Sequence, residues 1–372
     1  MPIYKTGKSK DGKQGYRVRV NYTDGNGKYR TKTQIVYGAP EAKTAEQAML
    51  ASVAEQPSNS HLTVKGLYNE YIDVKRLEVR ETTLDKAASI LKNNVLPELG
   101  DVKINKLDLR RLQSWKATIS EKDIAVITKQ NIYSAFRAML NYAVRMEYIL
   151  KNPLDKIGNF KEVYFEKPQD AIHYYTADQF KKFIAAAADH MGTMADHGYY
   201  VFFNIAFFTG MRKGEINALK WSDIDGNILH VRRSVAQKIK GKPLIETPPK
   251  NKSSCRDLQL PQNLMAILQE HKSLQQKEKL FTEDYRVCGG ISCLGDTAIS
   301  NRNIQYADEA GLPHIRIHDF RHSHASLLAN EGINIQEIAR RLGHSKIEIT
   351  WNTYSHLYPR EEERAIKILE NI

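Results

Sequence analysis

The sequence predicts an α+β, multidomain protein, and three observations lead to this expectation. The chain has 372 residues, enough for two or three domains of ordinary size. The opening segment alternates in character as strands do, whereas apolar side chains recur at helical spacing after residue 60. Polar segments at 56–60 and near 159–173 read as linkers. We therefore expect a small β-sheet domain at 1–56, a helical domain at 60–158 and a mixed, mainly α-helical domain at 174–372.

The N-terminal domain is expected to hold a sheet of two or three strands and one helix. Residues 16–22 alternate in character, as a half-buried strand does. Asp24-Gly25-Asn26-Gly27 is a strong hairpin signal, and residues 28–33 supply the return strand. A helical run follows over residues 44–54.

Four segments of the second domain have helical periodicity, with apolar residues on one face. They span residues 64–71, 83–96, 108–120 and 128–146. In the third domain, Thr176 and Gln179 fit a capping box that opens the first helix. Short strands are expected near 228–235 and 254–260, followed by helices to the end of the chain. Among these, the helix 335–342 is expected to end at Gly343.

The chain is strongly basic, with a formal net charge of +12 and a pI near 9.3. A surplus of this size favours a polyanionic partner, and nucleic acid is the usual one. No stretch is long and apolar enough for a membrane helix, and the N-terminus has no signal-peptide core. Three cysteines without zinc spacing fit a reducing compartment. We expect a cytoplasmic, nucleoid-associated protein without a membrane partner.

Basic and aromatic side chains are interleaved on the N-terminal strands. Such residues suit contact with DNA phosphates and base edges, because a sheet face can enter the major groove. A solvated basic face is an equally good interpretation. The candidate DNA-binding residues are Tyr16, Arg17, Arg19, Lys28, Arg30 and Lys32.

Three segments of the C-terminal domain carry candidate catalytic residues. Arg212 begins a helix just after Gly210, with Glu215 one turn later. A second segment has a His-x-x-Arg spacing, and a third has a His ten residues before a Tyr; these residues are His318, Arg321, His344 and Tyr354. Each segment alone is ordinary. Together they supply two arginines for a phosphate, two histidines for hydrogen bonds or proton exchange, and an oxygen nucleophile.

A metal is not expected at these segments. His322 and His324 are close in sequence, but no acidic or cysteine partner has suitable spacing. Phosphodiester transfer through a phosphotyrosine needs the residues named above and no metal. We therefore expect no metal and no cofactor.

The chain resembles the tyrosine recombinases of the lambda-type integrase family. The resemblance is carried by TGMRKGEI, HDFRHSHASLL and LGHSKIEITWNTYSHL, which occur in that order. It covers the whole chain, because the N-terminal sheet and the helical domain resemble the arm-binding and core-binding domains of integrases. Those integrases come from phages and conjugative transposons of Gram-positive bacteria.

The resemblance implies a role for each candidate. Arg212 and Arg321 would hold the non-bridging oxygens of the scissile phosphate and stabilise its transition state. His318 and His344 would be the two histidines of the family. Tyr354 would attack the phosphorus to form a 3′-phosphotyrosine and release a 5′-hydroxyl.

Supporting positions and a lysine complete the implied site. Glu215 and Asp319 would orient the first arginine and the helix. The family has a lysine in a β-hairpin that protonates the leaving 5′-oxygen, and the candidate hairpin here is 247–256. Lys252, before the Ser-Ser turn, is our first choice for this lysine and Lys250 the second.

The function implied is site-specific recombination that integrates and excises a mobile element. Two rounds of strand exchange would pass through a Holliday junction, without ATP. The implied partners are double-stranded DNA at core and arm sites, a homo-tetramer on that DNA, and an excisionase and a DNA-bending host protein as candidate accessory factors. The tail at 359–372 has helical spacing; we expect it to dock on a neighbouring protomer, and folding back on its own domain is the alternative. Trp351 and Tyr358 are interpreted as structural.

Three other functions compete with an integrase. A chromosome-dimer resolvase would use the same chemistry, but such enzymes usually lack an N-terminal sheet domain. A DNA-binding regulator that lost its chemistry would not need the complete set of candidate residues. A type IB topoisomerase shares the tyrosine nucleophile, but the arm-like domain fits it poorly.

Overall fold

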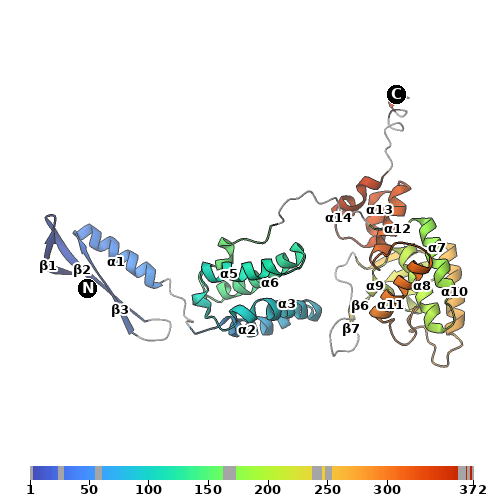
Figure 1. The fold of residues 1–372 in the computed structure, drawn as a ribbon, viewed down its shortest axis with the longest axis horizontal. Helices are drawn as coiled ribbons and strands as arrows, with labels where there is room; N and C mark the ends of the chain where they lie inside the picture. Colours follow the sequence, from blue (N-terminus) through green and yellow to red (C-terminus); the bar gives the residue numbers. More distant parts are fainter. Residues whose placement is uncertain are drawn as a thin grey trace. The chain divides into compact units, whose positions relative to one another are not determined.

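The computed structural model describes residues 3–23, 29–54, 61–161, 173–236, 245–247, 254–358, 366 and 369–370. The chain divides into an N-terminal unit, Met1–Phe165, and a C-terminal unit, Glu166–Ile372. Separate apolar cores form under the N-terminal sheet, among the following helices and within the C-terminal unit. The α+β, multidomain fold class is thus confirmed (Figure 1). The division into three domains at 1–56, 60–158 and 174–372 stays a prediction.

The N-terminal sheet has three antiparallel strands in the order β1-β2-β3, and one helix packs on it. The elements are β1 (Ile3–Lys10), β2 (Lys13–Thr23), β3 (Tyr29–Tyr37) and α1 (Ala39–Ala54). Alternation along β2 places Val18 and Val20 on one face, where they are buried against Ala42 and Met49 of α1. The predicted strands and helix are therefore confirmed. The predicted hairpin turn at 24–27 lies outside the described residues.

The four predicted helices of the next segment are all present. They are α2 (Val64–Glu78), α3 (Glu81–Asn94), α5 (Leu109–Glu121) and α6 (Val126–Arg145), with the short α4 (Leu96–Leu99) and the 3-10 turns η1 (Ile104–Lys106) and η2 (Pro153–Lys156) between or after them. Thr63 and Asp108 cap α2 and α5 by accepting backbone N–H bonds. The apolar faces of α2, α3, α5 and α6 meet in one core around Trp115 and Phe136, whose rings pack edge to face with centroids 5.0 Å apart.

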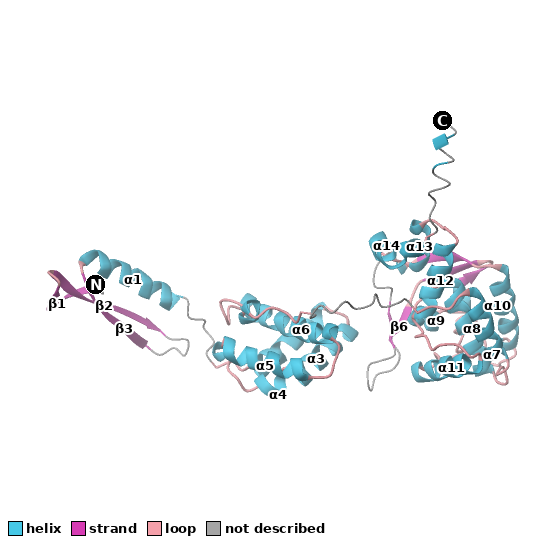
Figure 2. Cartoon of the chain, turned by 45° about the horizontal axis from the view of Figure 1, so that its top comes forward, coloured by secondary structure: helices cyan, strands magenta, loops and turns pink. Residues whose placement is uncertain are grey.

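The C-terminal unit is mostly helical, and its described strands form a three-stranded and a two-stranded sheet (Figure 2). Its helices are α7 (Ala177–Ala188), α8 (Met194–Thr209), α9 (Lys213–Ala218), α10 (Gln262–Gln275), α11 (Asp296–Glu309), α12 (Asp319–Asn330), α13 (Ile335–Leu342) and α14 (Ile347–Tyr354), with 3-10 turns η3 (Trp221–Asp223) and η5 (Ser355–Leu357). The capping box of Thr176 and Gln179 at the start of α7 is confirmed. The apolar α8 lies in the centre of the unit, where Phe202 and Phe203 are fully buried.

The strands of this unit include the two predicted sections near 228–235 and 254–260. They are β4 (Ile224–Asp225), β5 (Ile228–Val231), β6 (Ser234–Ala236), β7 (Ile245–Thr247) and β8 (Arg256–Gln259). The strand section expected near 228–235 holds β5 and most of β6, which belong to two different sheets, β4-β5-β8 and β6-β7. Arg232 and Arg233 separate β5 from β6 and form ion pairs with Asp257 and Asp223 respectively. Among the described residues, every helix is too short or too polar to span a bilayer.

Candidate active site

The turn between α8 and α9 positions Arg212. Gly210 ends α8 in the left-handed conformation, with φ of 63°. A Cβ atom there would stand 2.8 Å from the Cδ2 atom of His324, so glycine fits both the backbone and the space. Arg212 follows as the N-cap of α9, as predicted, and 39% of its side chain is exposed. The Arg212 guanidinium can therefore reach a ligand at the surface of the unit.

Glu215 holds Arg212 in this orientation. One carboxylate oxygen of Glu215 accepts from the Arg212 guanidinium at 2.8 Å, and the other accepts from the backbone N–H of Arg212 at 3.0 Å. The second oxygen also accepts from Arg256 of β8 at 2.9 Å. Glu215 and Arg256 are both almost fully buried. Burial alone would raise the pKa of Glu215, but Arg256 and Arg212 outweigh it and the pKa is lowered, so Glu215 is ionised at neutral pH.

Arg321 of α12 lies between the C-terminal ends of two helices. Its guanidinium donates to the carbonyl oxygen of Gly210 at 2.8 Å and to that of Leu342 at 2.6 Å. Both carbonyls lie at helix ends that close on a left-handed glycine, Gly210 for α8 and Gly343 for α13, the latter as predicted. Helix C-termini carry partial negative charge and so favour a cation. Burial, with Arg212 and Arg256, lowers the pKa of Arg321 to about 9, which leaves it charged at neutral pH.

The two predicted histidines lie beside these arginines. His318 is the N-cap of α12, and His344 follows α13 and shares a hydrogen bond of 2.8 Å with the hydroxyl of Thr350. Desolvation lowers the pKa of His318 to about 4, although part of its side chain stays accessible, and His322 and Arg321 act in the same direction. Desolvation, with Arg321 and Arg212, also lowers the pKa of His344 to about 4. Both rings are neutral near pH 7.

Tyr354, the last residue of α14, is buried, with 2% of its surface exposed. Its hydroxyl lies 2.6 Å from Nδ1 of His322, a residue for which the sequence predicts no role. Burial raises the pKa of Tyr354 above its usual value, although Arg321 acts in the opposite direction. The phenol is therefore protonated at neutral pH.

Five of the six residues predicted to be catalytic lie close together, and the sixth, Lys252, lies outside the described residues. Arg321 is within electrostatic reach of Arg212 and Tyr354, and His344 is within reach of both arginines and of His318. They come from the start of α9, the first turns of α12, the end of α13 and the end of α14. Among the described residues, no three His, Cys, Asp or Glu side chains are grouped as metal ligands. The arrangement combines two cations, two neutral imidazoles and a phenol, which suits a phosphodiester.

The remaining predicted positions have mixed outcomes. Asp319, 2% exposed, accepts from the backbone N–H of Arg316 at 2.8 Å and so fastens the start of α12. Lys252 and Lys250 lie outside the described residues. Tyr358 has a structural contact, donating to the carbonyl of Ile333 at 2.6 Å. Trp351 is 54% exposed, and its interpretation as a structural residue stays a prediction.

The basic residues of the N-terminal sheet do not share one face. Residues paired across antiparallel strands lie on the same face. Arg17 pairs with Ile35 and Arg19 with Thr33, so these arginines occupy the face away from α1. Three candidates occupy the α1 face instead, because they pair with or alternate with Val18 and Val20; they are Tyr16, Arg30 and Lys32. Tyr16 also packs against the small core, and Lys28 lies outside the described residues. The assignment of these six residues to DNA binding stays a prediction.

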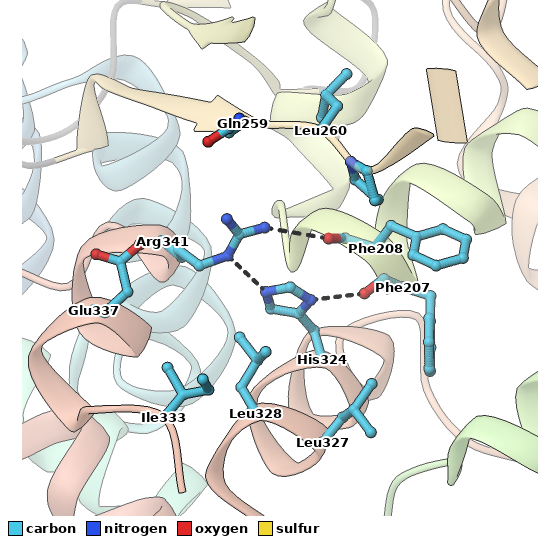
Figure 3. Close-up of a pocket in the computed structure, with 11 residues that line it drawn as sticks. Phe207, Phe208, Gln259, Leu260, His324, Leu327, Leu328, Ile333, Glu337 and Arg341 are labelled. Carbon is cyan, nitrogen blue, oxygen red and sulfur yellow. Dashed lines mark hydrogen bonds between the residues drawn. The ribbon is translucent and has the colours of Figure 1, made fainter. Parts of the chain in front are cut away.

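A separate groove of about 530 Å³ lies between α8, α12, α13 and the end of β8 (Figure 3). Arg341 lines the groove and donates to Nε2 of His324 at 3.3 Å and to the carbonyl of Phe208 at 3.4 Å. The walls are largely apolar and include Phe207, Phe208, Leu260, Leu327, Leu328 and Ile333. None of the predicted catalytic residues that the structure describes lines this groove, so it is not the candidate active site.

Comparison with known proteins identifies the family. Residues 173–361, just over half of the chain, match the model of the phage integrase family, and residues 63–118 match a phage integrase N-terminal SAM-like domain. The chain is 28% identical to a XerC-like tyrosine recombinase of Caldanaerobacter subterraneus, with 99% of each chain covered. It is 29% identical to the ICEBs1 integrase of Bacillus subtilis, with 72% of each covered.

Solved structures share the fold. The Tn1549 transposon integrase in complex with a circular intermediate DNA superimposes with a TM-score of 0.65 at 20% identity, covering 84% of this chain and all of that one. A lambda integrase tetramer bound to a Holliday junction has a TM-score of 0.58 at 17% identity, covering 97% of each chain. The extent of the family match shows that this chain belongs to the phage integrase family and is a site-specific tyrosine recombinase.

Proposed function

We propose that this recombinase is the integrase of a mobile element and that Tyr354 cuts DNA by forming a 3′-phosphotyrosine. The observation that carries the proposal is the gathering of Arg212, His318 and His344 around Arg321, which itself lies within electrostatic reach of the buried phenol of Tyr354. Two similar proteins are named after such elements: the ICEBs1 integrase and the Tn1549 transposon integrase. The substrate is double-stranded DNA, to which the basic charge of the chain is suited.

The two arginines hold the scissile phosphate. A diester carries one negative charge, and its pentacoordinate transition state carries a second, so fixed cations stabilise the transition state more than the substrate. Arg321 uses two of its five N–H donors on backbone carbonyls, which leaves three for phosphate oxygens. Arg212, braced by Glu215, supplies a second fork. His318 and His344 are neutral and donate hydrogen bonds to the same oxygens.

The cleavage step needs a proton at the leaving group. Tyr354 attacks the phosphorus, the bond to the 5′-oxygen breaks, and that oxygen takes a proton. Lys252 is our first choice for the donor of this proton and Lys250 is the second. Both lysines follow β7 in the sequence. The energy of the broken bond is kept in the phosphotyrosine, so a 5′-hydroxyl of a partner strand can attack and rejoin the DNA without ATP.

Two rounds of this exchange pass through a Holliday junction held by four protomers. A related integrase has been solved as a tetramer on such a junction. Residues 60–158 bind core sites together with the catalytic domain at 174–372, and residues 1–56 bind arm sites. An excisionase and a DNA-bending host protein are candidate accessory partners.

The tail at 359–372, of which Ile366 and Leu369 are exposed, docks on a neighbouring protomer. Deleting the chain after Pro359 should then abolish tetramers while DNA binding persists; unchanged assembly would contradict this role.

Within the N-terminal sheet, the face away from α1 is the one that contacts DNA. Arg17 and Arg19 project from it beside Tyr29, which is 79% exposed. The opposite face is partly covered by α1. Alanine at Arg17 and Arg19 should weaken arm-site binding more than alanine at Arg30 and Lys32. Equal losses for the two pairs would contradict the assignment of this face.

Covalent trapping tests the proposed function. Duplexes from the ends of the native element are first screened by gel shift, and one that the chain binds is nicked near the crossover so that rejoining fails. The wild-type chain should form an SDS-resistant, protease-sensitive adduct, whereas Tyr354→Phe should bind the duplex without forming one. Tyr358→Phe, which keeps the nucleophile, is the matched control and should form the adduct. Binding without any adduct would favour a DNA-binding regulator instead.

A further inference from the structure

The hydroxyl of Tyr354 has one specific partner. Nδ1 of His322 lies 2.6 Å from the Tyr354 oxygen, and the two ring centroids are 5.7 Å apart. His322 follows Arg321 directly on α12, so the same helix turn carries a phosphate-binding cation and the partner of the nucleophile. Among the described side chains, the only hydrogen bond recorded for this hydroxyl is the one to His322.

The reaction requires the phenol to lose its proton. A phosphotyrosine linkage has no hydrogen on its bridging oxygen, so the proton leaves when the bond to phosphorus forms. Burial raises the pKa of Tyr354, so the free phenolate is rare at neutral pH. A general base must lie within hydrogen-bond reach of the proton that it accepts, and 2.6 Å satisfies this distance.

His322 has the properties of such a base. Burial lowers its pKa, as do Arg316 and Arg321, while Asp319 opposes them, so the ring is neutral near pH 7. His318 also faces it, with ring centroids 5.3 Å apart. A neutral imidazole that carries its hydrogen on Nε2 has a free lone pair on Nδ1.

We propose that His322 is a catalytic residue that accepts the proton of Tyr354 during DNA cleavage. The inference rests on the proposed function and names a residue that it does not include. The Oη–phosphorus bond forms, the phosphorus–O5′ bond breaks, and the phenolic proton passes to Nδ1, giving an imidazolium. The leaving 5′-oxygen receives its proton from the separate lysine. In rejoining, a 5′-hydroxyl attacks the phosphorus and the imidazolium returns its proton to the departing Tyr354 oxygen.

The test is the single-turnover rate of adduct formation on the nicked duplex. His322→Asn keeps a polar atom near the position of Nδ1 but cannot take up a proton at this pH. The rate should fall by about 100-fold or more, the usual contribution of a general base, while DNA affinity and the unfolding temperature stay unchanged. His356→Asn, an exposed histidine two residues after Tyr354, is the matched control and should keep the wild-type rate.

A duplex with sulfur in place of the bridging 5′-oxygen separates the two proton transfers. A thiolate leaves without a proton, because its conjugate acid is far stronger than an alcohol. The sulfur substrate should restore cleavage by Lys252→Ala but leave His322→Asn slow. Wild-type rate in His322→Asn, or its rescue by sulfur, would overturn the assignment of His322. Failure of the wild-type chain to form any adduct would instead overturn the proposed function.

A measurement on the unmutated chain guards against a variant that folds poorly. With 15N-labelled histidine, the Nδ1 shift of His322, assigned by its loss in His322→Gln, reports whether that nitrogen carries hydrogen. The proposal requires an unprotonated Nδ1 that accepts from Tyr354. A hydrogen on Nδ1 near pH 7 would overturn it.

Discussion

The carboxylate of Glu215 should contribute more to stability than any exposed ion pair of the chain. The perturbation is Glu215→Gln, which preserves size and so leaves no cavity. It leaves the guanidinium of Arg256, 3% exposed, without its counter-ion. Breaking a buried pair in this way costs about 3–5 kcal/mol. The pair with Arg212 is 39% exposed on the arginine side and adds less than about 1 kcal/mol.

We take about 3 kcal/mol for Glu215→Gln, because the amide oxygen still accepts one hydrogen bond. For a unit of roughly 200 residues, each kcal/mol shifts the unfolding temperature by about 2–4 °C. The calorimetric transition of the C-terminal unit should therefore fall by about 6–12 °C. The N-terminal unit does not contain Glu215, so its transition is an internal reference.

The matched control is Glu283→Gln, which breaks an exposed pair of similar length. Its carboxylate lies 2.9 Å from Lys272, and 55% of the side chain is exposed. That change should cost less than about 1 kcal/mol. A shift below about 2 °C for Glu215→Gln, or equal shifts for the two variants, would refute the reasoning that links burial of this pair to stability.

Three further predictions follow from the described geometry. Replacing Arg17 and Arg19 by alanine should reduce the slope of log affinity against log salt for arm DNA by about 2, one for each lost phosphate contact, as measured by titration at several salt concentrations. Burial lowers the pKa of His271 to about 4, so its contribution to stability is complete above about pH 6.5 and is lost as pH falls toward 4. In denaturant titrations at several pH values, His271→Gln should reduce the acid loss of unfolding free energy by up to about 1.4 kcal/mol per pH unit, and an unaltered pH profile would contradict this. Gly210→Ala should cost about 3 kcal/mol in thermal unfolding and Gly226→Ala only about 1 kcal/mol, since both have positive φ but a Cβ meets nothing within 4 Å at Gly226.

The sequence predicted local structure well where one signal dominates. The capping box at Thr176 and the helix end at Gly343 are direct consequences of residue chemistry, and both are present. The division of the section near 228–235 between two sheets was not predictable, because Arg232 and Arg233 form ion pairs with Asp257 and Asp223, which are not their neighbours in the sequence.

The candidate site shows the same limit. Motif spacing predicted that Arg212 would stand beside Glu215, since both lie on one helix turn. It could not predict Arg256, which reaches Glu215 from a strand 41 residues away. The sequence raises His322 only as a possible metal ligand, because its bond to Tyr354, 32 residues later, depends on the packing of α14 against α12. The adjacency of His322 to Arg321 was the one available signal.

The position of Arg321 between two helix ends affects how this enzyme can change. The cost of immobilising its guanidinium is met when α8, α12 and α13 pack together, so the side chain is already fixed in the folded chain without a ligand. We therefore expect substitutions around Gly210 and Leu342 to prevent folding. They should not give folded enzymes with a different preferred target sequence. Laboratory selection for a different target sequence should accept changes in the N-terminal sheet and the helices at 64–145, and leave the ends of α8 and α13 unaltered.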